Sequence, residues 1–195
     1  MRRAGATIFA MVMLAAGCRE RKAAAAPAET SGKGAVVATT HETPSSAEAD
    51  KSFEDAQHHF ATVYPATWTT RKDDANVLCA SNNSAELDIA VPKLPAHIPG
   101  IIPLPAVQNG YVDDVRKRLK NVKTTSGEPI RVAGATARKF GISGVDDSGK
   151  TKNLLVIAIV KGDHLYIVTG EAPADSFDAA RDAVERVAAS WKWIK

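Results

Sequence analysis

Apart from a short apolar stretch near the start, the residues able to build a hydrophobic core lie in one part of this 195-residue chain. All three tryptophans and all three tyrosines come after residue 50, whereas residues 19–50 hold no aromatic residue, no leucine and no isoleucine. A segment of that composition buries too little apolar surface to offset the entropy that it would lose on folding. We therefore predict one folded domain over residues 51–195, which is close to the usual domain size, preceded by a flexible linker.

The start of the chain predicts export. Arg2 and Arg3 precede an apolar stretch over residues 8–16. This stretch is too short to cross the hydrocarbon core of a bilayer, which needs about 20 apolar residues, and it is typical of a secretory signal peptide. It ends in the sequence LAAGC, residues 14–18. Small residues directly before a cysteine resemble the lipobox of bacterial lipoproteins, although Ala15 stands where that pattern usually has leucine.

The lipobox resemblance implies a lipid anchor. Residues 1–17 would be a lipoprotein signal peptide cleaved after Gly17, Cys18 would carry a diacylglyceryl thioether, and the new amino terminus would be acylated, for example with palmitate. Residues 18–50 would then be the lipidated N-terminus and a disordered linker. Two or three acyl chains hold a protein on a membrane far more firmly than one chain does. The alternative is an ordinary cleaved signal peptide with an unmodified Cys18.

These features predict a place in the bacterial cell envelope, on a membrane surface, with the domain in the periplasm. Arg19, rather than aspartate, follows Cys18, which favours the outer over the inner membrane if the host uses the enterobacterial sorting rule. The formal net charge is only +3, from 25 basic and 22 acidic residues. A nucleic-acid-binding protein concentrates basic residues, so we expect no nucleic-acid partner.

Apolar residues at helical spacing predict two helices in the domain. The first covers residues 107–121, and the second begins at Asp175 or Ser176, one of which would cap it. The apolar faces are formed by Tyr111, Val115, Leu119 and Val122 in the first helix and by Phe177, Ala180, Val184, Val187 and Trp191 in the second.

The remaining apolar runs predict strands joined by turns. Residues 53–61 are either a short helix or the lead into a strand at 60–64, and Gly162-Asp163 suits a two-residue hairpin loop. Further strands are expected over residues 77–80, 87–91, 129–132, 135–145, 152–161 and 164–171. This order predicts an α+β fold in which helices cover an antiparallel sheet.

The arrangement resembles a known family. The sequence FATVYPATW, residues 60–68, resembles the opening strand and turn of PsbP/Mog1-like domains, and the hairpin over 154–169 is similar to theirs, as is the closing helix that ends in WKW, residues 191–193. The resemblance covers residues 55–195 and implies a PsbP/Mog1-like α/β/α sandwich. It implies no common reaction, because members are mostly assembly factors, binding modules and lipoproteins of unknown role, and it transfers no binding residue.

The sequence contains no recognisable catalytic or ligand-binding motif. The five histidines include no His-x-x-x-His pair, there is no Gly-x-Ser-x-Gly or phosphate loop, and Asp146 to Gly149 lack the glutamate of a calcium loop. We therefore expect no catalytic residue, no metal and no cofactor. Cys79 is interpreted as a small buried side chain with no disulfide partner in the domain, rather than as a nucleophile.

One segment is a candidate interaction loop. Residues 92–105 are apolar and hold five prolines. This loop either packs over one face of the sheet or exposes Ile101, Ile102 and Leu104 to a partner or to lipid. A stability measurement on Ile101→Asp separates the two alternatives.

The sequence thus predicts a membrane-anchored envelope lipoprotein whose domain is a non-catalytic binding or assembly module, with a protein partner in the envelope. Two alternatives stay open. The domain is a carrier that holds a lipid or small molecule in a cavity between sheet and helices. Less favoured is an envelope hydrolase whose active site is assembled from residues far apart in the chain.

Overall fold

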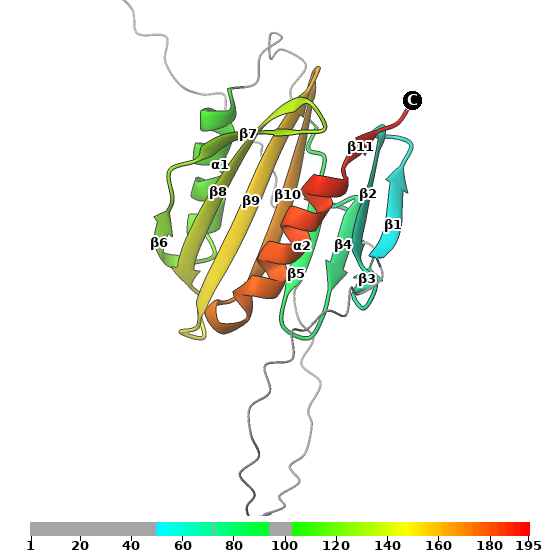
Figure 1. Ribbon diagram of the computed structural model, residues 1–195. Helices are drawn as coiled ribbons and strands as arrows, with labels where there is room; N and C mark the ends of the chain where they lie inside the picture. Colours follow the sequence, from blue (N-terminus) through cyan, green and yellow to red (C-terminus); the bar gives the residue numbers. More distant parts are fainter. Residues whose placement is uncertain (1–49, 72, 94–102) are drawn as a thin grey trace, which may run out of the picture.

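The computed structural model describes residues 50–71, 73–93 and 103–195 (Figure 1). Cys18, Ile101 and Ile102 lie outside the described residues. Among the described residues, the first strand begins at Asp50.

Across the described ranges the main sheet is paired antiparallel throughout, and the long β8–β9–β10 meander forms its centre (Figure 1). In spatial order its strands are β3 (Thr69–Arg71), β4 (Leu78–Ser81), β5 (Glu86–Ala90), β10 (His164–Pro173), β9 (Thr151–Lys161), β8 (Ala135–Val145) and β6 (Lys120–Thr124). A further strand, β7 (Glu128–Val132), lies off this path and pairs with β8.

A second, small sheet consists of β1 (Asp50–Asp55), β2 (Phe60–Pro65) and β11 (Lys192–Trp193), with β2 in the middle. Residues 53–61, for which the sequence left helix or strand open, are therefore the end of β1, a turn and the start of β2. Phe60, Thr62 and Tyr64 alternate along β2 and are buried, which is the pattern of a strand with one face against a core.

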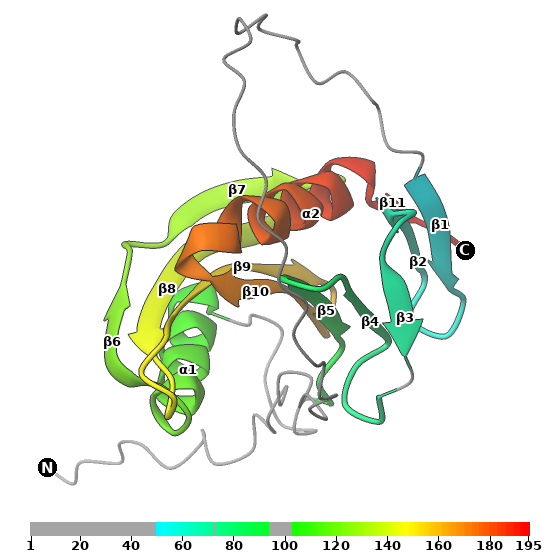
Figure 2. The ribbon, with the colours of Figure 1, turned by 90° about the horizontal axis from the view of Figure 1, so that it is seen from below.

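Two helices cover opposite faces of the main sheet (Figure 2). Helix α1 (Leu104–Arg116) packs with Phe140, Leu154 and Ile167, and helix α2 (Phe177–Ser190) packs with the other face and with the small sheet. Alternating residues of the central strands thus enter two separate cores. The predicted α+β fold, an antiparallel sheet between helices, is confirmed.

Helix α1 begins and ends earlier than predicted, at Leu104 and Arg116 instead of residues 107 and 121. Pro105 lies in the first turn, where a proline costs no hydrogen bond, so the helix starts inside the proline-rich segment. Leu119 is still buried in the core under α1, although it follows the helix, and Val122 lies on β6. The apolar spacing thus identified core residues correctly but extended the helix into the next strand.

The hairpin between β9 and β10 is confirmed. His164 pairs with Lys161, so Gly162 and Asp163 form the two-residue loop, and Gly162 has a φ of 61° that glycine adopts without strain. At the other end of β10 a 3-10 turn, Ala174–Ser176, leads into α2. Ser176 is the N-cap residue of α2, but its side chain makes no capping hydrogen bond, contrary to the prediction.

Candidate functional site

The structure changes the interpretation of the predicted interaction loop. Leu104 is the first residue of α1 and is only 9% exposed, in the core between α1 and the sheet. The packing alternative therefore holds for Leu104, which is not a surface residue. Ile101 and Ile102 lie outside the described residues, so their part in an interaction stays a prediction.

Cys79 lies on β4 and is almost fully buried, as the sequence predicted. The structure has this cysteine in a disulfide, so the prediction of a domain without a disulfide is wrong at this point. The chain holds only two cysteines. A disulfide within one chain would therefore use the same sulfur that lipidation of Cys18 requires. An experiment on the anchor has to distinguish lipidation of Cys18 from a disulfide with Cys79.

The least ordinary chemistry among the described residues is a group of three carboxylates on the α1 side of the main sheet. Glu86 and Asp88 come from β5 and Glu171 comes from β10. In the β5–β10 register Glu86 lies directly opposite Glu171, and Asp88 lies opposite Thr169. We call Glu86, Asp88 and Glu171 the acidic cluster. Like charges directly opposite one another destabilise a sheet, so this arrangement requires compensation.

Helix α1 and the residues after it supply part of that compensation. The Arg118 guanidinium donates a hydrogen bond to a Glu171 carboxylate oxygen at 2.7 Å, and both side chains are mostly buried. The Tyr111 hydroxyl forms a 2.9 Å hydrogen bond with the hydroxyl of Thr169. Because Tyr111 is on α1 and Arg118 closely follows that helix, these two contacts attach its second half to β10.

Asp88 is the member of the acidic cluster with the most perturbed ionisation. Only 6% of this residue is exposed. Burial and the nearby carboxylate of Glu86 raise the pKa of Asp88 to about 7, against a smaller opposing effect of Arg71. Asp88 therefore changes charge close to neutral pH. A carboxyl group of that kind can take up or release a proton, and such groups occur more often at functional sites than elsewhere.

The other side of the domain holds an aromatic cluster, formed by Phe60, Tyr166, Trp191 and Trp193. The rings of Phe60 and Trp191 stack at 4.3 Å between centroids, and Tyr166 contacts both tryptophans. The Lys161 ammonium lies 5.3 Å from the centre of the Trp193 ring. Because the rings contact one another, we interpret this cluster as the core that joins the small sheet to the end of the β9–β10 hairpin.

Side chains of the aromatic cluster also hold the turns at this end of the molecule. The Tyr166 hydroxyl donates to the carbonyl of His58, and the Trp193 indole donates to the carbonyl of Ala133. Ala133 has a φ of 46°, which is unfavourable for a residue with a side chain. The C-terminal strand thus fixes the end of the domain at which β9 and β10 are connected.

The remaining polar candidates are exposed. His164 and Asp163 contact each other at 2.7 Å in the hairpin loop, where the aspartate side chain is 91% exposed. Across the described ranges, no group of three or more histidine, cysteine, aspartate or glutamate side chains is placed to hold a metal ion. Within those same ranges, no helix has the length and apolar character needed to cross a membrane.

No family model and no curated protein matches this chain. Among solved structures, LpqN of Mycobacterium tuberculosis, described as involved in cell envelope biogenesis, matches with a TM-score of 0.57 and 14% identity, over 75% of this chain and 91% of LpqN. The cyanobacterial PsbP of Synechocystis sp. PCC 6803 matches with a TM-score of 0.53 and 11% identity, over 77% and 96%. The fold is PsbP-like.

A protein of Bacteroides thetaiotaomicron has the same fold over part of its length, with a TM-score of 0.54, 13% identity and coverage of 74% of this chain and 48% of that protein. At these identities the likeness of the PsbP-like domain concerns the fold alone. The resemblance seen in residues 60–68 and in the terminal hairpin is thereby supported at the level of architecture. The lipobox lies outside the described residues and stays a prediction.

The acidic cluster was missed by the sequence interpretation, although one signal for it exists. Asp88 interrupts an apolar strand between Leu87 and Ile89, which places it on the opposite face from those two side chains. The partners of Asp88 could not be inferred in the same way. β5 and β10 are separated by a long stretch of chain, and nothing in either strand specifies that they pair.

Proposed function

We propose that this protein is a membrane-anchored lipoprotein of the bacterial cell envelope, with a PsbP-like domain that acts as a non-catalytic binding or assembly module. The observation that carries the proposal is the sequence LAAGC at residues 14–18. It is followed by residues 19–50, which hold no aromatic residue, leucine or isoleucine, and then by the PsbP-like domain. The likeness to LpqN, a protein described as involved in cell envelope biogenesis, supports the same compartment. The partner we expect is a protein of the envelope.

Metabolic labelling with a palmitate analogue tests the anchor. The wild-type chain is expected to take up label and to sediment with membranes, whereas Cys18→Ala loses both properties because the thioether has no sulfur to form on. Cys79→Ala is the matched control, since it removes the other cysteine and keeps the lipobox. Absence of label from the wild-type chain would contradict the anchor.

The disulfide at Cys79 makes a second measurement necessary. The mass of the purified chain is compared before and after reduction, together with the count of free thiols. A lipidated Cys18 adds the mass of the acyl chains, which reduction does not remove, and leaves Cys79 as the only thiol within the domain. A mass without lipid, together with two thiols that appear only after reduction, supports a disulfide in place of an anchor.

Separation of inner and outer membranes tests the proposed location. Arg19 follows the lipidated cysteine, so we expect the labelled protein in the outer-membrane fraction if the host follows the enterobacterial sorting rule. Arg19→Asp is expected to move it to the inner-membrane fraction, while Arg21→Asp serves as the control because it lies outside the sorting position. An unchanged distribution of Arg19→Asp would contradict this part of the proposal.

The binding role is tested by crosslinking in the intact envelope, followed by purification and identification of the crosslinked proteins. A protein recovered with the wild-type chain and lost from Cys18→Ala supports an anchored binding module. Recovery of bound lipid or another small molecule in stoichiometric amount would support the carrier alternative instead.

One observation gives the hydrolase alternative a specific test. Asp88 is a buried carboxyl whose pKa is raised to about 7, which suits a general acid or base. Under the proposal, purified envelope material is not consumed by the wild-type protein. If it is consumed, and if Asp88→Asn abolishes the turnover while the folded structure is retained, the domain is an enzyme.

A further inference from the structure

Strand β1 is attached to the rest of the small sheet mainly by backbone pairing. Among the described strands it pairs with β2 alone, at the sheet edge, over six residue pairs from Asp50↔Pro65 to Asp55↔Phe60. Four of its six residues are exposed, and only Phe53 and Asp55 are half-buried. Outside the backbone pairing, Phe53 contributes a ring contact with Phe60 at 5.9 Å between centroids. Asp55 accepts a hydrogen bond from the backbone N–H of His58 and contacts the His58 ring at 2.7 Å, and these contacts within the turn have to break before β1 can leave.

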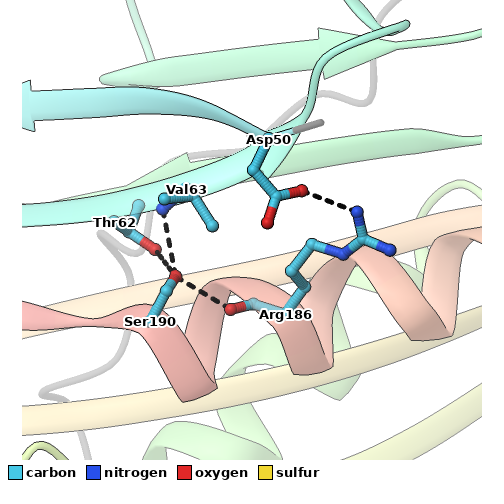
Figure 3. A network of polar contacts seen from close by, with 5 residues as sticks. All are labelled: Asp50, Thr62, Val63, Arg186 and Ser190. Atoms are coloured by element: carbon cyan, nitrogen blue, oxygen red, sulfur yellow. Dashed lines mark hydrogen bonds and ion pairs between the residues drawn. The ribbon is translucent and has the colours of Figure 1, made fainter. Parts of the chain in front are cut away.

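The neighbouring strand β2 is held quite differently (Figure 3). The Thr62 hydroxyl donates to the carbonyl of Val187 on α2 at 2.8 Å, and the backbone N–H of Val63 donates to the Ser190 hydroxyl at 3.0 Å. The Ser190 hydroxyl in turn donates to the carbonyl of Arg186. Strand β2 is thus fastened to α2 by contacts that do not involve β1.

An ion pair connects the start of β1 to the same helix. The Arg186 guanidinium donates to an Asp50 carboxylate oxygen at 2.6 Å, with both side chains 35% exposed (Figure 3). A partly exposed pair of this kind contributes little to holding a strand in place. If β1 leaves, β2 and α2 therefore keep their own contacts, and the edge of β2 can pair with another extended peptide. We call this edge of β2 the strand-binding site.

The chemistry of this strand-binding site is defined by β1 itself. It accepts six extended residues, a ring against Phe60 and a carboxylate against Arg186. Residues 50–55 of a second copy match that chemistry at every position, because they are the same sequence. The turn that would act as the hinge, residues 56–59, includes His59 at a φ of 58°, a backbone conformation that an extended hinge would release.

We propose that two copies of this chain exchange β1, so that residues 50–55 of one copy pair with β2 of the other. Strand exchange between identical chains reuses the contacts of the monomer, which makes it an accessible route to a dimer. The exchange does not require the lipid anchor proposed above. An anchor would raise the local concentration of the chain and so favour the dimer, but the exchange is measured without it.

The test uses the cross-strand pair Ser52 and Val63, which lie directly opposite each other in the β1–β2 register. Two full-length chains are prepared with Cys18 and Cys79 replaced by alanine, one carrying Ser52→Cys and the other Val63→Cys. The two are mixed, incubated and oxidised. In the exchanged dimer the two new thiols lie opposite each other and form an intermolecular disulfide. A heterodimer on a non-reducing gel is the expected result.

Two controls define the interpretation. The chain carrying both Ser52→Cys and Val63→Cys is expected to form the same disulfide internally, remain monomeric and lose the ability to exchange. A mixture of Ser52→Cys with Thr70→Cys, an exposed residue on β3, is expected to give no heterodimer above background. Absence of the Ser52–Val63 heterodimer, while the double variant forms its internal disulfide, overturns the proposal.

A synthetic peptide of residues 50–55 with Ser52→Cys identifies a different occupant. If the peptide crosslinks to Val63→Cys but the full chain does not, the strand-binding site accepts a foreign strand and not a second copy, which also overturns the proposal.

A hinge variant lacking residues 56–58 gives a measurement without new cysteines. The shortened turn prevents the internal hairpin, so we expect a folded dimer by light scattering, and a folded monomer would contradict the exchange.

Discussion

Replacement of Asp88 by asparagine is expected to stabilise the domain at neutral and higher pH. Burial and Glu86 raise the pKa of Asp88 from 3.8 to about 7 in the folded state. Between these two values the folded chain binds more protons than the unfolded chain, so the free energy of unfolding falls as the pH rises through this window. Above the folded pKa the destabilisation is complete and no longer changes with pH.

The magnitude follows from the size of the pKa difference. About 3 units at about 1.4 kcal/mol per unit give roughly 4 kcal/mol as an upper bound for the destabilisation by the ionised carboxylate at slightly alkaline pH. The asparagine side chain has nearly the same shape as that of aspartate and carries no charge. The difference in unfolding free energy between Asp88→Asn and the wild-type chain is therefore expected to be near zero at about pH 4 and to reach a few kcal/mol at about pH 8.

Urea unfolding measures this difference directly. The fluorescence of Trp68 and Trp191, both buried in the core beneath α2, reports on the transition at a series of pH values. Glu54→Gln, at an exposed position on β1, is the control, and its effect on stability is expected to be small at every pH. A stability difference for Asp88→Asn that stays constant with pH, or that grows as the pH falls, would refute the assignment of the raised pKa.

Three further changes test other contacts of the domain. Arg118→Met removes the cation that pairs with Glu171 inside the acidic cluster, so it is expected to cost about 1–3 kcal/mol in urea unfolding at neutral pH. An unchanged stability would contradict the role of this pair. Ala133→Gly relieves the φ of 46° and is expected to raise the unfolding free energy by up to about 1 kcal/mol, with a higher melting temperature as the readout. Gly170→Ala places a Cβ 2.6 Å from the carbonyl oxygen of Ala180 on α2, and a destabilisation of about 1–3 kcal/mol is expected, whereas a neutral result would show that α2 shifts freely.

The parts of the fold that follow from local chemistry were predictable. Gly162-Asp163 between two apolar runs specified the β9–β10 hairpin, and the spacing of Phe177, Val184 and Val187 specified the buried face of α2. The end of α1 was not predictable in the same way. Leu119 continues the apolar spacing of the helix and is buried like the helix residues, so the pattern alone does not show that the helix has already ended at Arg116.

The acidic cluster depends on strand pairing that could not be inferred from the sequence pattern. Asp88 and Glu171 are each ordinary acidic residues in their own strands, and their ionisation becomes unusual only because β5 pairs with β10 and α1 covers the face they share. Non-local strand pairing depends on how the whole chain packs, and one sequence specifies it only weakly. The pairing of β1 with β2 is different, because these two strands follow each other in the chain and form a hairpin.

The two faces of the sheet separate Asp88, whose charge depends on pH, from the contacts that hold the start of β1. Asp88 faces the α1 side, whereas Arg186 belongs to α2 and holds Asp50 on the other side. Substitutions that share no contact partner act on stability independently. The change in unfolding free energy of the double variant Asp88→Asn with Arg186→Ala is therefore expected to equal the sum of the changes in the two single variants, within about 0.5 kcal/mol at every pH. A larger coupling in urea unfolding would mean that the charge of Asp88 is transmitted through the sheet to the start of β1.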